Sequence, residues 1–243
     1  MTGVFADKAS ARDYVWSRLE MEGLAVEPFP IRNRIPNFRD AEKAALKLFE
    51  IEPWASARFI KVNPDSPQLH VRAEALRRGI KVYVPTPRLA GGFMLLDPVN
   101  IPREQILRAS ARSSWDEYAK PVALSDLPHF DGIVAGSVAV TKDGRRAGKG
   151  AGYSDLEFAL LRELGHPAVP VATTVHDTQI VGNFPDEVVD QRLHTIATPT
   201  FVWLTGVNPH DGPTRIDWSR LGPDVIAAMP PLQEILGCRD QSK

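Results

Sequence analysis

The chain has 243 residues, of which 43% are hydrophobic and 24% charged, and its formal net charge at pH 7 is -1. This composition is ordinary for a globular protein and fits one large domain, or one domain with an appendage. The near-neutral charge excludes a general basic surface for nucleic acid or anionic membranes, so any positive site must be local. The single cysteine, Cys238, excludes an internal disulfide and a cysteine-based zinc cluster.

Targeting signals are not evident in the chain. Its beginning is charged and lacks an apolar signal region, and no apolar run reaches membrane-spanning length. We therefore expect a cytoplasmic protein with no membrane partner.

The first third of the chain alternates helical and extended patterns. Residues 8–22 have the spacing of an amphipathic helix, on which Lys8 and Arg12 share one face. By itself this pair indicates a solvated cationic edge. A proline-rich connector follows, and Asn37 is placed to cap a second amphipathic helix.

A strand–helix–strand unit comes next. Residues 58–62 and 80–84 have strand patterns, and the segment between them is helical up to Gly79. Ligands of such folds bind beyond the carboxyl ends of the strands, which places Asp65 and residues 86–88 near any site. Asp65 could instead serve only as a turn or helix-start residue, which is the commoner role.

The remaining elements continue the alternation. Trp115 and Tyr118, which could stack on a flat ligand, are interpreted as core residues. Strands are predicted at 93–96, 133–140, 170–175, 193–197 and 201–204, and helices at 103–112 and after residue 153. We predict an α/β fold: a three-layer, Rossmann-like open sheet, mostly parallel, with helices on both faces. Residues 1–205 are expected to form this domain, and residues 206–243 an appendage packed on it.

The segment 143–165 is the centre of this organisation. It reads DGRRAGKGAGYSDLEFALLRELG; it follows an apolar β-branched run, and its second half has a helical period. The sequence therefore predicts a strand, a glycine-rich loop and a helix. Ser154 and Glu157 have the spacing of a capping box, and Gly165 is placed to end the helix.

The loop has the composition of an anion-binding site. Its alternating glycines are Gly148, Gly150 and Gly152. They leave backbone N–H groups open to a phosphate, and Arg146 and Lys149 add positive charge. Glycines and cations also occur at such positions for backbone geometry and solvation alone, and the spacing matches neither the Walker motif nor the dinucleotide motif.

Acidic residues could complete a metal site. Asp155 either caps the helix or supplies an oxygen ligand to a Mg²⁺ shared with a nucleotide. Asp177, at the carboxyl end of a predicted strand, could converge on it, although such a residue more often serves a turn. Asp190 and His194 offer two metal-ligand types without a third.

The loop and its surroundings resemble a known family. Residues 146–155, RAGKGAGYSD, closely resemble the motif R-x-G-[RK]-G-x-G-Y-Y-D of the 5-formyltetrahydrofolate cyclo-ligases, also called methenyltetrahydrofolate synthetases. Lys8 and Arg12 are similar to the family's N-terminal K-x-x-x-R pair, and the segment through Asp177 is similar to its late strand. The segments VNPDSPQ and YVPTPRL look more like its divergent branch, the methenyltetrahydrofolate synthetase domain-containing proteins.

The resemblance implies an enzyme that uses ATP and Mg²⁺ to convert 5-formyltetrahydrofolate to 5,10-methenyltetrahydrofolate, with ADP and phosphate as the other products. It implies catalytic roles for Lys8, Arg146 and Lys149. Asp155 and Asp177 would bind Mg²⁺, and Ile60, Asp65 and Tyr153 would contact the folate. The implied ATP-binding residues are Lys8, Arg12, Arg146, Gly148, Lys149, Gly150, Ala151, Gly152 and Tyr153.

Three departures from the family motif leave the substrate open. Ser154 replaces the second Tyr, Leu156 replaces the following Arg, and the expected Glu is Asp65. Two alternatives therefore remain: MgATP chemistry on another small carbonyl or formamide compound, and a nucleotide-, RNA- or partner-binding protein without turnover. We expect reduced folate and ATP as partners rather than nucleic acid, in a monomer or small homo-oligomer.

Overall fold

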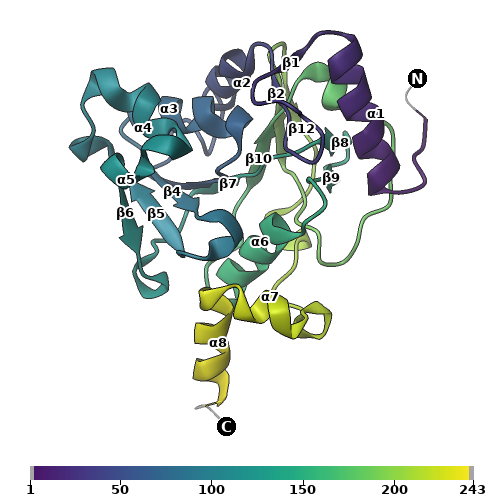
Figure 1. Ribbon diagram of the computed structural model, residues 1–243. Helices are drawn as coiled ribbons and strands as arrows, with labels where there is room; N and C mark the ends of the chain where they lie inside the picture. The colour runs from purple at the N-terminus through teal and green to yellow at the C-terminus, as the bar shows by residue number, and fades with distance from the viewer. Residues whose placement is uncertain (1–2, 241–243) are drawn as a thin grey trace.

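The computed structural model describes residues 3–240, so the outermost residues of the two expected regions, 1–2 and 241–243, lie outside it. Within the described part of the chain, eight strands form one sheet in the order β12-β11-β10-β7-β3-β4-β5-β6. These strands are β3 (Phe59–Val62), β4 (Lys81–Pro85), β5 (Phe93–Leu96), β6 (Ala119–Val122), β7 (Gly132–Val134), β10 (Val171–Thr174), β11 (Thr195–Ala197) and β12 (Val202–Leu204). From β11 to β4 neighbouring strands run parallel, whereas the pairings of β12, β5 and β6 are antiparallel. The predicted, mostly parallel sheet is confirmed (Figure 1).

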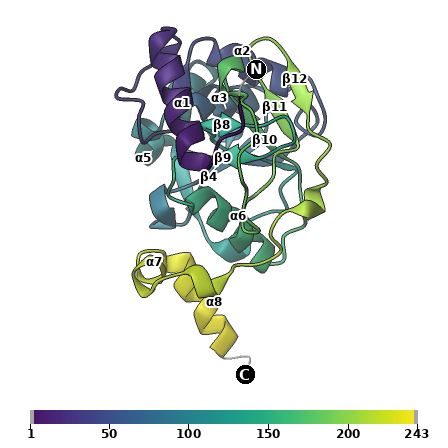
Figure 2. The same cartoon turned by 90° about the vertical axis from the view of Figure 1, so that its right-hand side faces the viewer.

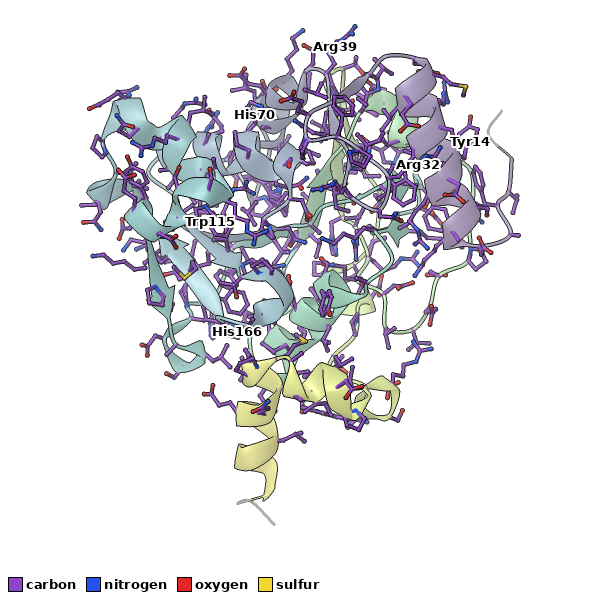
Figure 3. All side chains as sticks on the ribbon, in the orientation of Figure 1. Tyr14, Arg32, Arg39, His70, Trp115 and His166 are labelled. Carbon is purple, nitrogen blue, oxygen red and sulfur yellow. The ribbon has the colours of Figure 1, made fainter. Side chains whose placement is uncertain are left out.

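Helices cover both faces of this sheet, which gives the predicted three layers. One face, which we call the α2–α5 face, packs against α2 (Ala41–Leu48), α3 (Leu69–Arg77), α4 (Ile106–Ser110) and α5 (Trp115–Tyr118). The opposite face, the α6 face, packs against α6 (Tyr153–Glu163) and α8 (Pro230–Asp240). Trp115 is buried in the first of these cores, as predicted (Figure 3).

The alternation of side chains along β3 decides which residues face the later site. Ile60 and Val62 enter the core on the α2–α5 face, while Phe59 packs into the core on the α6 face. Because successive strand residues point to opposite faces, Lys61 also points toward α6. Its ammonium group forms an ion pair with Glu157 of that helix.

Two small sheets lie beside the main one. They are β1 (Ala25–Val26) with β2 (Asn37–Phe38), and β8 (Ala139–Val140) with β9 (Arg146–Ala147). Helix α1 (Lys8–Met21) packs on the second of these hairpins. The predicted strand at 133–140 is therefore wrong as a single element, because the chain leaves the main sheet after β7. Asn37 is also not a helix cap, since it lies in β2 and Asp40 precedes α2.

Short 3-10 helices make many of the connections. They are η1 (Ser66–Gln68), η2 (Pro87–Leu89), η3 (Pro98–Asn100), η4 (Arg103–Gln105), η5 (Arg112–Ser114), η6 (Leu124–Asp126), η7 (Asp177–Gln179), η8 (Pro209–Asp211) and η9 (Trp218–Arg220). The first of them begins directly after Asp65. Connections of this kind place loop side chains at the ends of the parallel strands, where the cavities described below open.

The segment after β12 returns to α6 and packs against it. Ile216, Met229 and Leu232 are buried in the core on the α6 face. Helices α7 (Pro223–Ala227) and α8 lie at the end of the molecule away from α1 in both views (Figures 1 and 2). Between residues 3 and 240, no helix combines the length and apolar character that crossing a membrane requires.

Candidate functional site

The glycine-rich loop joins β9 to α6 in a conformation that depends on its glycines. Gly150 and Gly152 have φ values of +105° and +69°, a backbone region in which an L side chain is strained. A Cβ atom at Gly148 would lie 2.9 Å from Nη1 of Arg146. The loop can therefore fold over the Arg146 guanidinium only because these positions lack side chains.

The helix after the loop begins without the predicted capping box. Gly152 occupies the cap position of α6. The Ser154 hydroxyl accepts hydrogen bonds from the side-chain amides of Asn63, at 3.1 Å, and Gln191, at 2.7 Å, while Glu157 pairs with Lys61. The prediction is wrong because tertiary partners on the sheet engage both side chains that local spacing had assigned to the cap.

Two cavities flank the loop. The large cavity, of about 650 Å³, extends toward α1 and the C-terminal segment, and the small cavity, of about 430 Å³, extends toward η1. The loop-region residues that line both are Arg146, Gly148, Ala151, Gly152, Tyr153 and Asp155. The loop is thus a common wall between two spaces, each within or near the size range of a small-ligand site.

Arg146 is held at this wall by two acceptors, one of which is fixed in turn by a backbone N–H. The residue is only 4% exposed, and its Nη2 donates to Asp155 Oδ1 at 2.6 Å. Its Nη1 donates to the Gly136 carbonyl oxygen at 3.0 Å. The backbone N–H of Gln191 donates to the same Asp155 oxygen at 3.2 Å. Arg146 and Asp155 therefore form one fixed ion pair that reaches both cavities.

Both N-terminal cations, Lys8 and Arg12, line the large cavity together with the loop. Arg12 Nη1 donates to the Gly148 carbonyl oxygen at 3.4 Å, and Lys8 Nζ lies 2.5 and 2.6 Å from the two carboxylate oxygens of Asp190. Asp190 also accepts a hydrogen bond from the Glu187 N–H at 2.6 Å. All five residues line the large cavity, so Asp190 is a candidate site residue that the sequence did not single out.

The small cavity holds the other predicted cation. Lys149 Nζ lies 3.5 Å from Asp65 Oδ1, and both residues line this cavity together with Thr86. A Cβ atom at Gly136 would lie 2.7 Å from Asp65 Oδ2, so the absence of a side chain there leaves room for the carboxylate. The structure thus brings Asp65 and the segment after β4 to the same cavity as Lys149.

A buried charged pair lies under the small cavity. Lys61 Nζ is 2.6 Å from Glu157 Oε2 and donates to Asn63 Oδ1 at 2.6 Å. Burial raises the pKa of the Glu157 carboxyl, and the attraction of Lys61 opposes that rise. Both Asn63 and Glu157 line the small cavity. The only sequence signal for this pair was a lysine inside an otherwise apolar strand.

Two predicted site residues are not brought to the loop. Ile60 is 1% exposed and lies in the core on the α2–α5 face, because the strand alternation turns Lys61, and not Ile60, toward α6. Asp177 begins η7, and its carboxylate accepts hydrogen bonds from the hydroxyls of Thr198, at 2.6 Å, and Thr200. Neither residue lines the large or the small cavity, so the expected convergence of Asp177 on Asp155 is not found.

The donor set can hold Mg²⁺ only with help from a ligand. Across residues 3–240, no cluster of three or more His, Cys, Asp or Glu side chains is arranged to hold a metal. Asp155 and Asp190 nevertheless both line the large cavity. One or two carboxylates plus phosphate oxygens are the usual ligands of a nucleotide-bound Mg²⁺, and the residues present fit that arrangement.

Comparisons with known proteins identify the family of the chain. Residues 14–199 match the model of the 5-formyltetrahydrofolate cyclo-ligase family. The methenyltetrahydrofolate synthase domain-containing proteins of Mus musculus and Bos taurus are 39% and 37% identical, over 94% and 97% of this chain. The chain spans 63% of the length of each of these relatives.

A solved structure supports the fold. The NMR structure of a 5,10-methenyltetrahydrofolate synthetase from Aquifex aeolicus has a TM-score of 0.52 and 15% identity, covering 83% of this chain and 94% of that chain. Its likeness concerns the three-layer architecture alone. This chain belongs to the 5-formyltetrahydrofolate cyclo-ligase family.

Proposed function

We propose that the protein is an ATP- and Mg²⁺-dependent cyclo-ligase that acts on 5-formyltetrahydrofolate or a closely related formylfolate. The observation that carries this proposal is the shared wall between the two cavities. Phosphoryl transfer requires a donor phosphate and an acceptor oxygen to be held in contact and shielded from water. A loop with one cavity on each side, and with Arg146 and Asp155 at both, suits that requirement.

In this proposal the large cavity takes the triphosphate. The loop amides and Arg12 bind its oxygens, and Lys8 exchanges part of its contact with Asp190 for a phosphate. A bound Mg²⁺ supplies charge neutralisation, and Asp155 and Asp190 would hold it. Asp177 has no part, because its carboxylate is engaged by two threonines outside the cavity.

The small cavity then takes the formyl compound. The formyl oxygen attacks the γ-phosphorus, and the bond to the β,γ-bridging oxygen breaks to release ADP. N10 of the folate next attacks the activated carbon, and inorganic phosphate leaves with loss of the N10 proton as the ring closes. Arg146 and Lys149 stabilise the negative charge on the transferred phosphoryl group, which is the main task of the protein in such a step.

A second candidate is MgATP chemistry on another small formyl or carbonyl compound. Among the described residues that line the small cavity, Tyr153 is the single aromatic one, and most of the others are polar or charged. A pterin would favour more apolar and aromatic surface than this wall offers. Turnover distinguishes the two acceptors, so the assay below includes both outcomes.

The test is incubation of the purified protein with MgATP and 5-formyltetrahydrofolate, with the methenyl product followed by absorbance. We expect Lys149→Ala to lower kcat about 100-fold, as for loss of one group that stabilises transition-state charge. Lys142→Ala is the matched control, because Lys142 lies 4.6 Å from the Trp203 ring centroid and lines neither cavity. MgATP binding without product would favour the second candidate, and absence of MgATP binding would refute both.

A further inference from the structure

The large cavity has a wall that the family match does not include. The match ends at residue 199, whereas the structure carries the cavity on into the segment 206–240. The residues that this segment contributes to the lining are Pro213, Arg215, Asp217, Arg220, Leu221 and Val225. A ligand in the large cavity would therefore contact a part of the chain that lies outside the matched family pattern.

The wall is apolar where it approaches α6. Leu221 and Val225 line the cavity together with Leu156 and Ala159 of that helix. All four belong to the core on the α6 face or pack against it, and Leu156, Leu221 and Val225 are half-buried, so part of each side chain remains accessible. An accessible apolar slot beside a phosphate-binding loop is a suitable surface for a flat heterocycle.

The two ends of the cavity differ in character. Helix α1, with Lys8 and Arg12, lies on one side of the start of α6, and α7, with Val225, lies on the other side in both views (Figures 1 and 2). The lining thus runs from Lys8 and Arg12 to a wall in which the apolar Leu221 and Val225 lie beside charged side chains of the same segment. A nucleoside triphosphate could place its phosphates at the first end and its base on the apolar side chains of the second.

The wall is anchored to the rest of the site. Arg220 Nη1 lies 2.7 Å from Glu187 Oε2, in the segment that also carries Asp190. Ile216 is buried in the core on the α6 face. Arg215, which also lines the cavity, has no hydrogen-bond or ion-pair partner among residues 3–240 and is free to bind a ribose hydroxyl or a phosphate oxygen.

We infer that residues 206–240 form the nucleobase subsite, in which Leu221 and Val225 hold the base of ATP against Leu156. This inference rests on the proposed MgATP-dependent function. It gives the C-terminal segment a direct part in ligand binding, beyond covering α6.

Calorimetric titration of the full chain with MgATP and with magnesium tripolyphosphate tests it, because only the first ligand carries a base. For the double variant Leu221→Ala/Val225→Ala we expect a Kd for MgATP about tenfold higher, equivalent to about 1.4 kcal/mol, and an unchanged Kd for tripolyphosphate. Ile226→Ala is the matched control: Ile226 lies in the same helix and packs on the same core but does not line the cavity. It should leave both Kd values unchanged.

The other outcomes separate this inference from the proposed function. Binding of neither ligand by the unaltered protein would refute the proposed function, and the inference with it. Binding of MgATP that the double variant leaves unchanged, or an equal loss for both ligands, would overturn the inference alone. If the double variant does not fold, photolabelling of the unaltered protein with 8-azido-ATP decides: the label is expected within residues 206–240 or beside Leu156, and labelling elsewhere would overturn the inference.

Discussion

The buried pair of Lys61 and Glu157 allows the sharpest test of how the loop is supported. The two side chains are 1% and 6% exposed, and Lys61 Nζ also donates to Asn63 Oδ1. Lys61→Met keeps the length of the side chain but removes its charge, which leaves Glu157 and the Asn63 oxygen without their shared donor. We expect the free energy of unfolding to fall by about 3–5 kcal/mol, the usual cost of removing one partner from a buried pair.

A double-mutant cycle separates the stranded charge from lost packing. In Lys61→Met/Glu157→Met no charge remains uncompensated, and such replacements of a buried pair are often neutral or stabilising. The double variant should therefore recover most of the loss, with a coupling energy of about 2 kcal/mol or more. A double variant that loses as much as the sum of the two single variants would show that packing, and not charge, carries the effect.

The pH dependence gives an independent check. Burial already raises the pKa of Glu157 above the value of 4.5 of the free side chain, and Lys61→Met removes the attraction that opposes this rise. In the folded variant Glu157 then holds its proton more tightly than in the unfolded chain. The variant therefore loses stability as the pH rises above 4.5 and toward the raised pKa of folded Glu157. Urea denaturation at pH 5 and pH 8 should show a smaller deficit, relative to the unaltered protein, at pH 5. A deficit below about 1 kcal/mol, or one that does not shrink at pH 5, would refute the reasoning.

Three further predictions concern single positions. Gly152→Ala should lower the free energy of unfolding by about 1–2 kcal/mol, because the position has a φ of +69°; thermal denaturation measures the loss, and an unchanged midpoint would contradict it. Burial lowers the pKa of His194, whose Nδ1 accepts a hydrogen bond from the Val171 N–H. Because the unfolded chain takes up the proton first, stability should fall as the pH drops below about 6.5. His194→Asn, with an acceptor oxygen that does not titrate, should flatten this dependence by up to about 1.4 kcal/mol per pH unit in urea titrations at several pH values. Asp190→Asn should raise the Kd for MgATP about tenfold in calorimetry while Asp177→Asn leaves it unchanged, and the reverse order would contradict the placement of the two carboxylates.

Much of the sheet could be predicted because its central strands are short apolar runs bounded by turns. β3, β4 and β10 were found within a residue or two of their ends. The direction of β5 was harder, since its own pattern does not encode direction. The seven residues between Pro85 and Phe93 did carry a signal, because a parallel neighbour needs a crossover of about a dozen residues or more. The short connection explains why β5 returns antiparallel to β4.

The glycine-rich loop was predictable because its residues are contiguous in sequence. The buried pair of Lys61 and Glu157 beneath it was not. Alternating glycines and two cations are contiguous in sequence, and the structure places them between the two cavities. The spacing of Ser154 and Glu157 instead suggested a helix cap, and only the fold reveals that Glu157 meets Lys61, 96 residues earlier. The alternation along β3 predicts that Lys61 and Ile60 point to opposite faces of the sheet, but it does not identify Glu157 as the partner of Lys61.

The two aspartates show why a position at a strand end is insufficient evidence for a metal ligand. Asp177 follows a parallel strand, where ligands commonly bind, yet the turn between β11 and β12 brings two threonine hydroxyls to its carboxylate. Asp190 lies in an irregular segment that no periodic pattern marks, and Lys8, 182 residues away in sequence, meets it at the large cavity. In the proposed function a triphosphate would draw Lys8 away and leave Asp190 free to bind Mg²⁺ together with Asp155, whereas no such exchangeable cation faces Asp177 among the described residues. The role of each acid therefore follows from the partners that the fold brings to it, and not from its place along the chain.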